Sequence, residues 1–356
     1  MNKIYVNARF LTQSLTGVQR FSLEVCKELN LIRSDLIFLV PRKSEIVDLS
    51  ILENFNIVEV VGGCGHYWEQ VTLPIYLRRI GSPFLLNLGN TAPVFYKNKI
   101  FAHHDITYIR FPESYSLRFR LIYQLIASLN FKNSLSFITV SEFSKKDISD
   151  FYNVEMKDIH VLYNGVNSSF KENKSLISKN KKPFALAVSS PSHHKNFSAL
   201  INAFNKIDNP IELKIIGSST NIFKNLKDYE VNPNINFLGR ISDDELIELY
   251  QTAEFFVFPS LYEGFGIPPL EAQACGCPVI SSNAASLPEV LQDSAYYFNP
   301  KDVNSIRDAI LKVLGDYSLR NTLKNSGLNN VKRFSWHSSA LKLDLLLNDL
   351  KEKLYD

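Results

Sequence analysis

Short apolar runs alternate with amphipathic segments along both halves of the chain, and this alternation predicts parallel sheets built from βαβ units. In the first half we expect strands at residues 3–8, 36–40, 57–61, 84–88, 99–103 and 136–140. The pattern then begins again, with strands expected at 184–189, 211–216, 235–238, 255–258, 278–281 and 295–297. The lysine-rich stretch 172–183 separates the two sets and is typical of a domain boundary.

Polar residues before the apolar periods predict where helices begin. Asn196 precedes an apolar stripe, and Ser242 and Ser286 are each followed by a glutamate three residues later. We therefore expect Asn196 to cap a helix and the two serines to form capping boxes. A last helix is expected from about Trp336, with no strand after it.

Size and composition fit two ordinary globular domains. A chain of 356 residues is too long for a single typical core, and 45% hydrophobic residues exclude a disordered protein. The net charge of +3 is too small to indicate a nucleic-acid partner. The N-terminus lacks the apolar core of a signal peptide, no apolar run is long enough to cross a bilayer, and the four cysteines are scattered. A cytoplasmic location is expected.

The segment from Ser260 to Ala272 carries the strongest functional signal. It places Glu263 and Glu271 on either side of the sequence Gly-Phe-Gly-Ile-Pro-Pro, directly after the apolar run 253–259. The glycines allow close approach of a ligand, and the two prolines suit the first turn of a helix. Free N–H groups at the start of such a helix bind anions at the carboxyl end of a strand. The spacing alone carries no weight, because Glu45 and Glu53 share it without a glycine loop. On the residues alone, Glu271 could also simply offset the dipole of the helix.

In this context the segment resembles the signature of the family 4 retaining glycosyltransferases. The resemblance implies the GT-B fold, in which two Rossmann-like, doubly wound α/β domains face each other across a cleft. The expected division is an acceptor-binding domain at residues 1–170, a nucleotide-sugar-binding domain at 171–335, and a helix at 336–356 that crosses back to the first domain. The sequence is most similar to bacterial mannosyltransferases that build surface polysaccharides.

The resemblance assigns donor-binding roles in the second half. Glu263 would contact hydroxyl groups of the sugar, and Glu271 would hold the ribose. Lys195, at the end of the segment Ser189-Ser-Pro-Ser-His-His-Lys-Asn, matches the lysine that binds the diphosphate. The arginine that many members carry in this loop is absent, so His194 is a candidate to supplement Lys195. Further donor contacts are expected from Gly17, from Arg240 and Ile241 beside the base, and from the loop residues Gly264, Phe265, Gly266 and Ile267.

The first half supplies the other candidates. His104 and Asp105 match a His-Asp segment near the transferred sugar, and Asn90 and Thr91 are candidate acceptor contacts. Together with Glu263 and Lys195, His104 and Asp105 form the expected catalytic set.

The resemblance also defines the expected reaction. A hexose would pass from a nucleotide sugar, GDP-mannose favoured over UDP- or dTDP-sugars, to a growing lipid-linked or surface glycan of the O-antigen or capsule type. No cofactor is expected, and the absence of an Asp-x-Asp cluster is the reason to expect no metal. A nucleotide-sugar epimerase and a partner subunit without catalysis are the alternatives.

Residues 115–133 leave one question open. Leucines at 117, 121 and 125 lie among Arg118, Arg120 and Lys132. Such a helix either turns its leucines to the core or uses them, with its basic residues, for peripheral contact with an anionic membrane.

Overall fold

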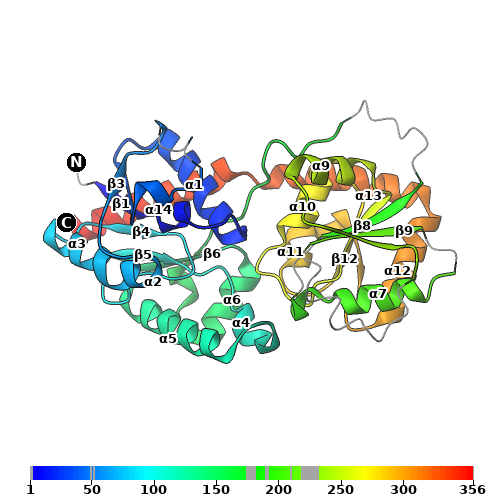
Figure 1. Cartoon of the computed structure of the whole chain (residues 1–356), viewed down its shortest axis with the longest axis horizontal. Coiled ribbons are helices and arrows are strands. Elements are labelled where there is room, and N and C mark those ends of the chain that lie inside the picture. Colours follow the sequence, from blue (N-terminus) through cyan, green and yellow to red (C-terminus); the bar gives the residue numbers. More distant parts are fainter. Residues whose placement is uncertain are drawn as a thin grey trace. The chain divides into compact units, whose positions relative to one another are not determined.

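The computed structural model describes residues 3–48, 50, 53–173, 182–188, 192–208, 211–217 and 232–355. It divides into two compact units (Figure 1): unit 1 comprises Met1–Asn164 and Ser335–Asp356, and unit 2 comprises Gly165–Phe334. The expected domain limits, 1–170, 171–335 and 336–356, fall close to these positions. Residue 189 of the strand predicted at 184–189 lies outside the described residues. Residues 174–181 of the stretch 172–183 do so as well.

Unit 1 contains a seven-stranded parallel sheet with the order β3-β2-β1-β4-β5-β6-β7. Its strands are β1 (Ile4–Asn7), β2 (Leu36–Val40), β3 (Ile57–Glu59), β4 (Leu85–Asn87), β5 (Lys99–Ala102), β6 (Ser136–Thr139) and β7 (Ile159–Val161). The apolar run of β2 is buried along its whole length, as expected for a strand covered on both faces. The short strand β7 was not predicted.

The main helices of unit 1 are α1 (Gly17–Ile32), α2 (Gly65–Tyr67), α3 (Leu73–Arg79), α4 (Thr107–Arg110), α5 (Leu117–Asn133), α6 (Glu142–Tyr152) and α14 (Trp336–Tyr355). A π-helical turn, η4 (Trp68–Thr72), joins α2 to α3. Helix α14 packs along α1 (Figure 1), where Arg33 forms an ion pair with Asp344 at 2.5 Å. The last helix thus belongs to unit 1, as the resemblance implied.

Unit 2 contains a six-stranded parallel sheet with the order β10-β9-β8-β11-β12-β13. Its strands are β8 (Phe184–Val188), β9 (Glu212–Ile216), β10 (Ile235–Gly239), β11 (Phe255–Phe258), β12 (Val279–Ser282) and β13 (Ala295–Phe298). Helices lie on both faces of the sheet (Figure 1): α7 (Phe197–Asn205), α9 (Asp243–Thr252), α10 (Ile267–Ala274), α11 (Leu287–Leu291), α12 (Val303–Gly315) and α13 (Tyr317–Asn330). Apolar residues of the strands, α7 and α12 form one continuous core.

The predicted caps had different outcomes. Ser242 forms the complete capping box with Glu245. The prediction was wrong for Asn196 and for Ser286, because neither side chain caps its helix. Both side chains instead donate hydrogen bonds to carbonyl groups of distant loops, which the local sequence does not reveal.

The core-facing interpretation of the leucines in α5 was also wrong. Leu117, Leu121 and Leu125 are 63%, 58% and 61% exposed, while Ala127, Asn130 and Phe131 near the helix end are buried. Within the described residues, no helix is both long enough and apolar enough to cross a membrane.

Candidate functional site

The order of the strands in unit 2 marks the place where a ligand is expected. The order reverses between β8 and β11, because β9 and β10 follow on one side of β8 while β12 and β13 follow on the other side of β11. In open α/β sheets, ligands bind outside the carboxyl ends of the strands at such a switch point. The loop after β8 carries Lys195, and the loop after β11 carries Glu263.

Lys195 and Glu263 form a two-point ion pair. The Nζ atom of Lys195 lies 2.7 Å from Oε1 and 3.0 Å from Oε2 of Glu263. Their side chains are only 19% and 12% exposed, so water screens this pair less than a surface pair. Lysine Nζ carries three N–H groups, and both carboxylate oxygens lie within hydrogen-bond distance of it. The structure therefore brings together the two residues that the sequence analysis placed at the phosphate and at the sugar.

Hydrogen bonds tie the two loops to each other. Asn196 has a left-handed backbone with a φ of 59°, and its side chain donates to the carbonyl oxygens of Pro259 and Pro300 at 3.1 and 2.8 Å. The backbone N–H of Leu261 donates to the carbonyl oxygen of the buried residue His194 at 2.7 Å. These bonds hold Lys195 in position beside the loop that carries Glu263. Ser189, Ser190 and Pro191 lie outside the described residues.

Hydrogen bonds from Ser286 hold the loop between Glu263 and α10 in place. The hydroxyl of Ser286 donates to the carbonyl oxygens of Glu263 and Phe265, both at 3.0 Å. Gly266 has a φ of +95°, and a Cβ atom there would lie 2.7 Å from Leu287 Cδ2. The positive φ therefore favours glycine at this position, and a Cβ would also force the Leu287 side chain to shift. The Phe265 ring is buried against the ring of Phe334. Only the backbone of Phe265 can therefore contact a ligand.

Glu271 occupies a different position from the one that the helix-dipole interpretation requires. Helix α10 begins at Ile267 with both prolines in its first turn, as predicted, so Glu271 falls in the second turn. Its side chain is only 6% exposed. A buried carboxylate beyond the first turn gains little from the dipole.

Arg240 and Ile241 lie farther along the same edge of the sheet. They follow β10, which β9 separates from β8, and both are at least partly exposed. These two residues thus flank the switch-point loops and are not part of them.

In unit 1, the structure brings His104 and Asn90 together. The side-chain oxygen of Asn90 accepts from the backbone N–H of His104 at 2.9 Å, and His104 Nε2 lies 3.1 Å from the carbonyl oxygen of Leu88. Because a carbonyl only accepts, Nε2 donates, and Nδ1 is the acceptor of the ring. Burial lowers the pKa of His104, and the Leu88 carbonyl and the charge of Asp105 oppose this only in part. The imidazole is therefore neutral at pH 7.

Asp105 already has a local role. Its Oδ1 atom accepts hydrogen bonds from the backbone N–H of Thr107 at 2.8 Å and from the Thr107 hydroxyl at 2.6 Å. These bonds fix the turn that leads into α4. Gly17 is the first residue of α1, and an added Cβ there would meet no atom within 4 Å, so packing does not require a glycine at this position.

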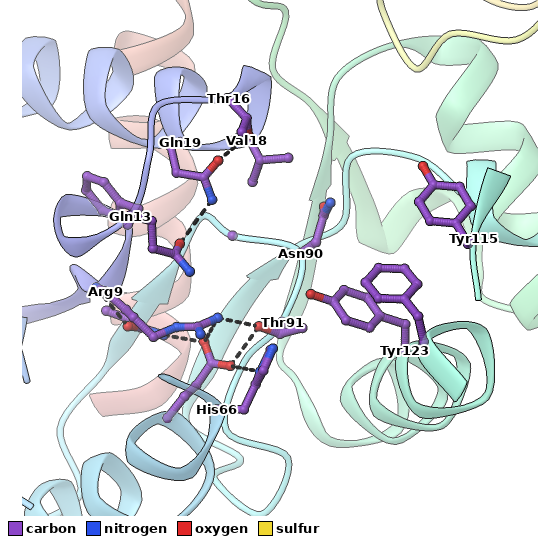
Figure 2. A pocket seen from close by; sticks show the side chains of 15 residues that line it. Arg9, Gln13, Thr16, Val18, Gln19, His66, Asn90, Thr91, Tyr115 and Tyr123 are labelled. Carbon is purple, nitrogen blue, oxygen red and sulfur yellow. Dashed lines mark hydrogen bonds and ion pairs between the residues drawn. The ribbon is translucent and has the colours of Figure 1, made fainter. Parts of the chain in front are cut away.

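The sequence analysis missed most of a pocket in unit 1. This pocket has a volume of about 570 Å³ and is shown in Figure 2. Asn90 and Thr91 line it, as do residues that carried no motif: Arg9, His66, Glu69, Tyr115, Phe119 and Tyr123. An available signal was the position of Arg9 two residues after β1, at the carboxyl end of a strand.

Comparisons with known proteins show the family of the chain. A family model described as glycosyl transferases group 1 matches residues 168–330. The O-antigen chain mannosyltransferase RfbU of Salmonella typhimurium is 32% identical over 251 residues, which are 69% of this chain and 69% of that enzyme. The chain therefore belongs to the group 1 glycosyl transferases, and the family suggested by its sequence is confirmed.

Further relatives match over shorter stretches. O-antigen chain mannosyltransferase B of Escherichia coli is 47% identical over 104 residues, which are 29% of this chain and 27% of that enzyme. The chain thus spans only about a quarter of that relative.

Solved structures show the same fold. Sucrose-phosphate synthase from Thermosynechococcus elongatus has a TM-score of 0.78 at 17% identity, covering 99% of this chain and 100% of its own. HepE of Anabaena, solved in complex with UDP and glucose, has a TM-score of 0.77 at 16% identity, covering 98% of this chain and 100% of its own. The predicted GT-B fold class is confirmed.

Proposed function

We propose that this glycosyltransferase is a retaining enzyme that moves a hexose from a nucleotide sugar to a growing lipid-linked or surface polysaccharide. GDP-mannose is the favoured donor, because relatives with 32% and 47% identity are named O-antigen chain mannosyltransferases. UDP- and dTDP-sugars are the alternatives. The observation that carries the proposal is the Lys195–Glu263 pair at the switch point of the second sheet.

Unit 2 supplies the donor contacts in this proposal. Lys195 binds the diphosphate, with His194 and the N–H groups of loop 264–267 beside it. A phosphate oxygen that reaches Lys195 must share it with Glu263, so the carboxylate lies next to the sugar end of the diphosphate. Glu263 accepts hydrogen bonds from hydroxyl groups of the sugar, Glu271 from the ribose, and the backbone at Arg240 and Ile241 contacts the base.

The chemical step follows from these contacts. The acceptor hydroxyl bonds to the anomeric carbon on the face that the diphosphate leaves, and the departing phosphate oxygen takes the hydroxyl proton. Configuration is thereby retained without a carboxylate nucleophile. Negative charge grows on the diphosphate, and Lys195 with the loop amides stabilises it, so the proposed reaction needs no metal ion. His104, held neutral, presents Nδ1 as an acceptor for a hydroxyl of the transferred sugar.

A screen of nucleotide sugars tests the proposal. The full chain is incubated with GDP-mannose, UDP-glucose and dTDP-glucose, with and without EDTA, and release of the nucleoside diphosphate is followed. We expect turnover with one donor, unchanged by EDTA, and an α-configured product from an α-configured donor by NMR. Release of an isomerised nucleotide sugar would favour an epimerase, and no turnover with any donor would favour a partner subunit without catalysis.

We also propose that α5 makes peripheral contact with the cytoplasmic face of an anionic membrane. Its exposed residues Leu117, Leu121 and Leu125 recur at intervals of one helical turn, and the exposed residue Arg118 adds positive charge beside them. Co-sedimentation with phosphatidylethanolamine–phosphatidylglycerol vesicles tests this contact. We expect binding that weakens at high salt and is absent with phosphatidylcholine vesicles; equal binding to both, or to neither, would contradict it.

A further inference from the structure

The pocket in unit 1 lies at the switch point of the first sheet. The strand order reverses between β1 and β4, and the last residues of these two strands, Asn7 and Asn87, are joined by a side-chain hydrogen bond of 2.5 Å. Arg9 follows β1, and Asn90 and Thr91 follow β4. A volume of about 570 Å³ is in the range of pockets that enclose a small ligand.

One wall of this pocket is polar and centred on a buried carboxylate. Glu69 is 1% exposed and lies on the π-helical turn η4, a distortion frequently found at functional sites. Its oxygens accept from Asn7 Nδ2 at 2.9 Å and from the Thr91 hydroxyl at 2.7 Å, and one lies 3.4 Å from Arg9 Nη2 (Figure 2). Burial raises its pKa, but His66, Arg9 and Thr91 together bring the pKa below its usual value, so Glu69 is ionised at pH 7.

Arg9 retains donors that can serve a ligand. Both contacts of its side chain, to Glu69 and to Thr91 at 3.1 Å, use the same Nη2 atom. The guanidinium group has further N–H groups on Nε and Nη1. Gln13 and Gln19, linked by a hydrogen bond of 3.0 Å, add planar amide groups on the same side of the pocket (Figure 2).

The opposite wall is aromatic. Tyr115, just before α5, and Phe119 and Tyr123 on the first two turns of α5 line the pocket; Figure 2 labels Tyr115 and Tyr123. The ring centroids of Tyr115 and Phe119 are 5.2 Å apart, and those of Phe119 and Tyr123 are 3.9 Å apart, with both pairs stacked. Stacking covers the two faces of Phe119, so this wall presents ring edges and the outer faces of the end rings, an apolar surface that can be buried at low entropic cost.

These two walls match the two surfaces of a pyranose. A sugar ring has an apolar face of C–H groups, which packs on aromatic rings, and a rim of hydroxyl groups, which bond to planar polar side chains. The charges of the lining residues also matter: Arg9 is balanced by Glu69, and His66 adds a charge only when it is protonated. This balance favours a neutral sugar over a phosphate, which would require uncompensated positive charge.

We propose that this pocket binds the neutral sugar residue at the acceptor end of the glycan, with Tyr123 and the edges of the stacked rings against its C–H face and Arg9 at its hydroxyl groups. Glu69 is a positioning residue that holds Arg9 and Thr91. This inference rests on the proposed glycan acceptor. It adds Arg9 and Tyr123 to the predicted acceptor contacts Asn90 and Thr91.

Direct binding to the full chain tests the proposal. The probes are methyl α-D-mannopyranoside and mannose 6-phosphate, followed by saturation-transfer NMR with wild type, Tyr123→Ala, Tyr123→Phe and Tyr317→Ala. Tyr317 is 76% exposed in unit 2, so its variant matches the loss of a tyrosine without touching the pocket. We expect binding of the neutral probe, roughly tenfold weaker in Tyr123→Ala and kept in the other two variants. Equal binding in Tyr123→Ala, preference for the phosphorylated probe, or no binding would overturn the proposal.

Kinetics separate this inference from the proposed function. In Tyr123→Ala, KM for the acceptor should rise about tenfold while KM for the donor and acceptor-independent donor hydrolysis stay near wild type. A parallel loss of donor hydrolysis would indicate general damage to the fold and would count against a binding role. If no donor is turned over by wild type but the neutral probe still binds through Tyr123, the proposed function fails and the saccharide pocket stands.

Discussion

At the scale of single residues, the Lys195–Glu263 pair has two consequences for a ligand. The carboxylate fixes the ammonium group at the switch point, which lowers the entropic cost of binding a phosphate there. It also neutralises that ammonium group, so the carboxylate competes with any phosphate that approaches. The two effects oppose each other, and substitutions on the two sides of the pair should therefore differ in direction.

Removal of the lysine tests the first effect. In Lys195→Ala, the affinity for GDP should fall roughly tenfold or more, because a charge-assisted contact to the diphosphate is lost. Isothermal titration calorimetry provides the measurement. Lys312→Ala is the matched control, since Lys312 is an exposed lysine of α12 that pairs with Asp316, and its loss should leave GDP binding unchanged. Equal affinity in Lys195→Ala and wild type would remove Lys195 from the phosphate site.

Lys99, a buried residue at the start of β5, gives a prediction of pH dependence. Burial lowers the pKa of its ammonium group to about 7, and its Nζ donates to the carbonyl oxygens of Tyr96 and Asn133. In the unfolded chain this pKa is near 10.4. Between these two values the unfolded state binds more protons, so the contribution of Lys99 to stability falls as the pH drops from about 10 to about 7.

The variant Lys99→Met removes this titration. The difference in free energy of unfolding, Lys99→Met minus wild type, should be largest at and below pH 7. It should decrease by up to about 1.4 kcal/mol per pH unit as the pH rises toward 10. Urea denaturation at several pH values measures the difference. A difference that stays constant with pH would show that Lys99 is charged in the folded protein.

At the scale of elements, the loop that joins β11 to α10 is built for one backbone conformation. Gly266 supplies a positive φ, and Ser286 at the start of α11 holds two carbonyl groups of the loop. The N–H groups of residues 264–267, which precede the two prolines of α10, are thereby fixed before a ligand arrives. Preorganised N–H groups of this kind are the feature that anion binding and charge stabilisation require.

Substitution of this glycine should show the strain directly. Gly266→Ala should destabilise unit 2 by about 1–3 kcal/mol, because the added Cβ meets Leu287 and the backbone is left-handed. Gly315→Ala is the control, since a Cβ there meets no atom within 4 Å. Urea denaturation of both variants provides the comparison. If Gly266→Ala is as stable as Gly315→Ala, the loop does not have the conformation described here.

The sequence predicted those elements whose signals are local. The apolar run of β2 and the capping box of Ser242 are complete in the sequence itself, and the structure confirms both. Ser286 has the same local pattern as Ser242, and Asn196 precedes an apolar stripe, but their partners are carbonyl groups of loops far away in the sequence. Strand β7 has only three residues at the edge of its sheet, too few for a periodicity.

The candidate site shows the same limit. Glu263 and Lys195 could be found because glycine and proline residues around them form a motif. Glu69 could not, because it lies within a helical stretch without a motif and acquires its role from Asn7 and Thr91, which other strands bring to it. The exposed face of α5 was likewise hidden, since the period of its leucines does not tell which side of the helix faces the core.

At the scale of the whole molecule, each unit has a parallel doubly wound sheet whose order reverses once, and each reversal carries a different chemistry. The second sheet presents a lysine and a carboxylate suited to an activated sugar. The first presents a charge-balanced, aromatic pocket suited to a neutral one. A transferase needs a donor and an acceptor, and under the two proposals above each unit binds one of them.

The most direct test of the account is the turnover of GDP-mannose by wild type and Glu263→Gln, followed by NMR, with GDP binding measured by calorimetry on the same samples. We predict that wild type consumes the donor, and that Glu263→Gln loses turnover by roughly a hundredfold or more while binding GDP at least as tightly, because Lys195 is then free of its carboxylate. Equal turnover in the two proteins, or loss of GDP binding together with turnover in Glu263→Gln, would contradict the assignment of Glu263 to the transferred sugar.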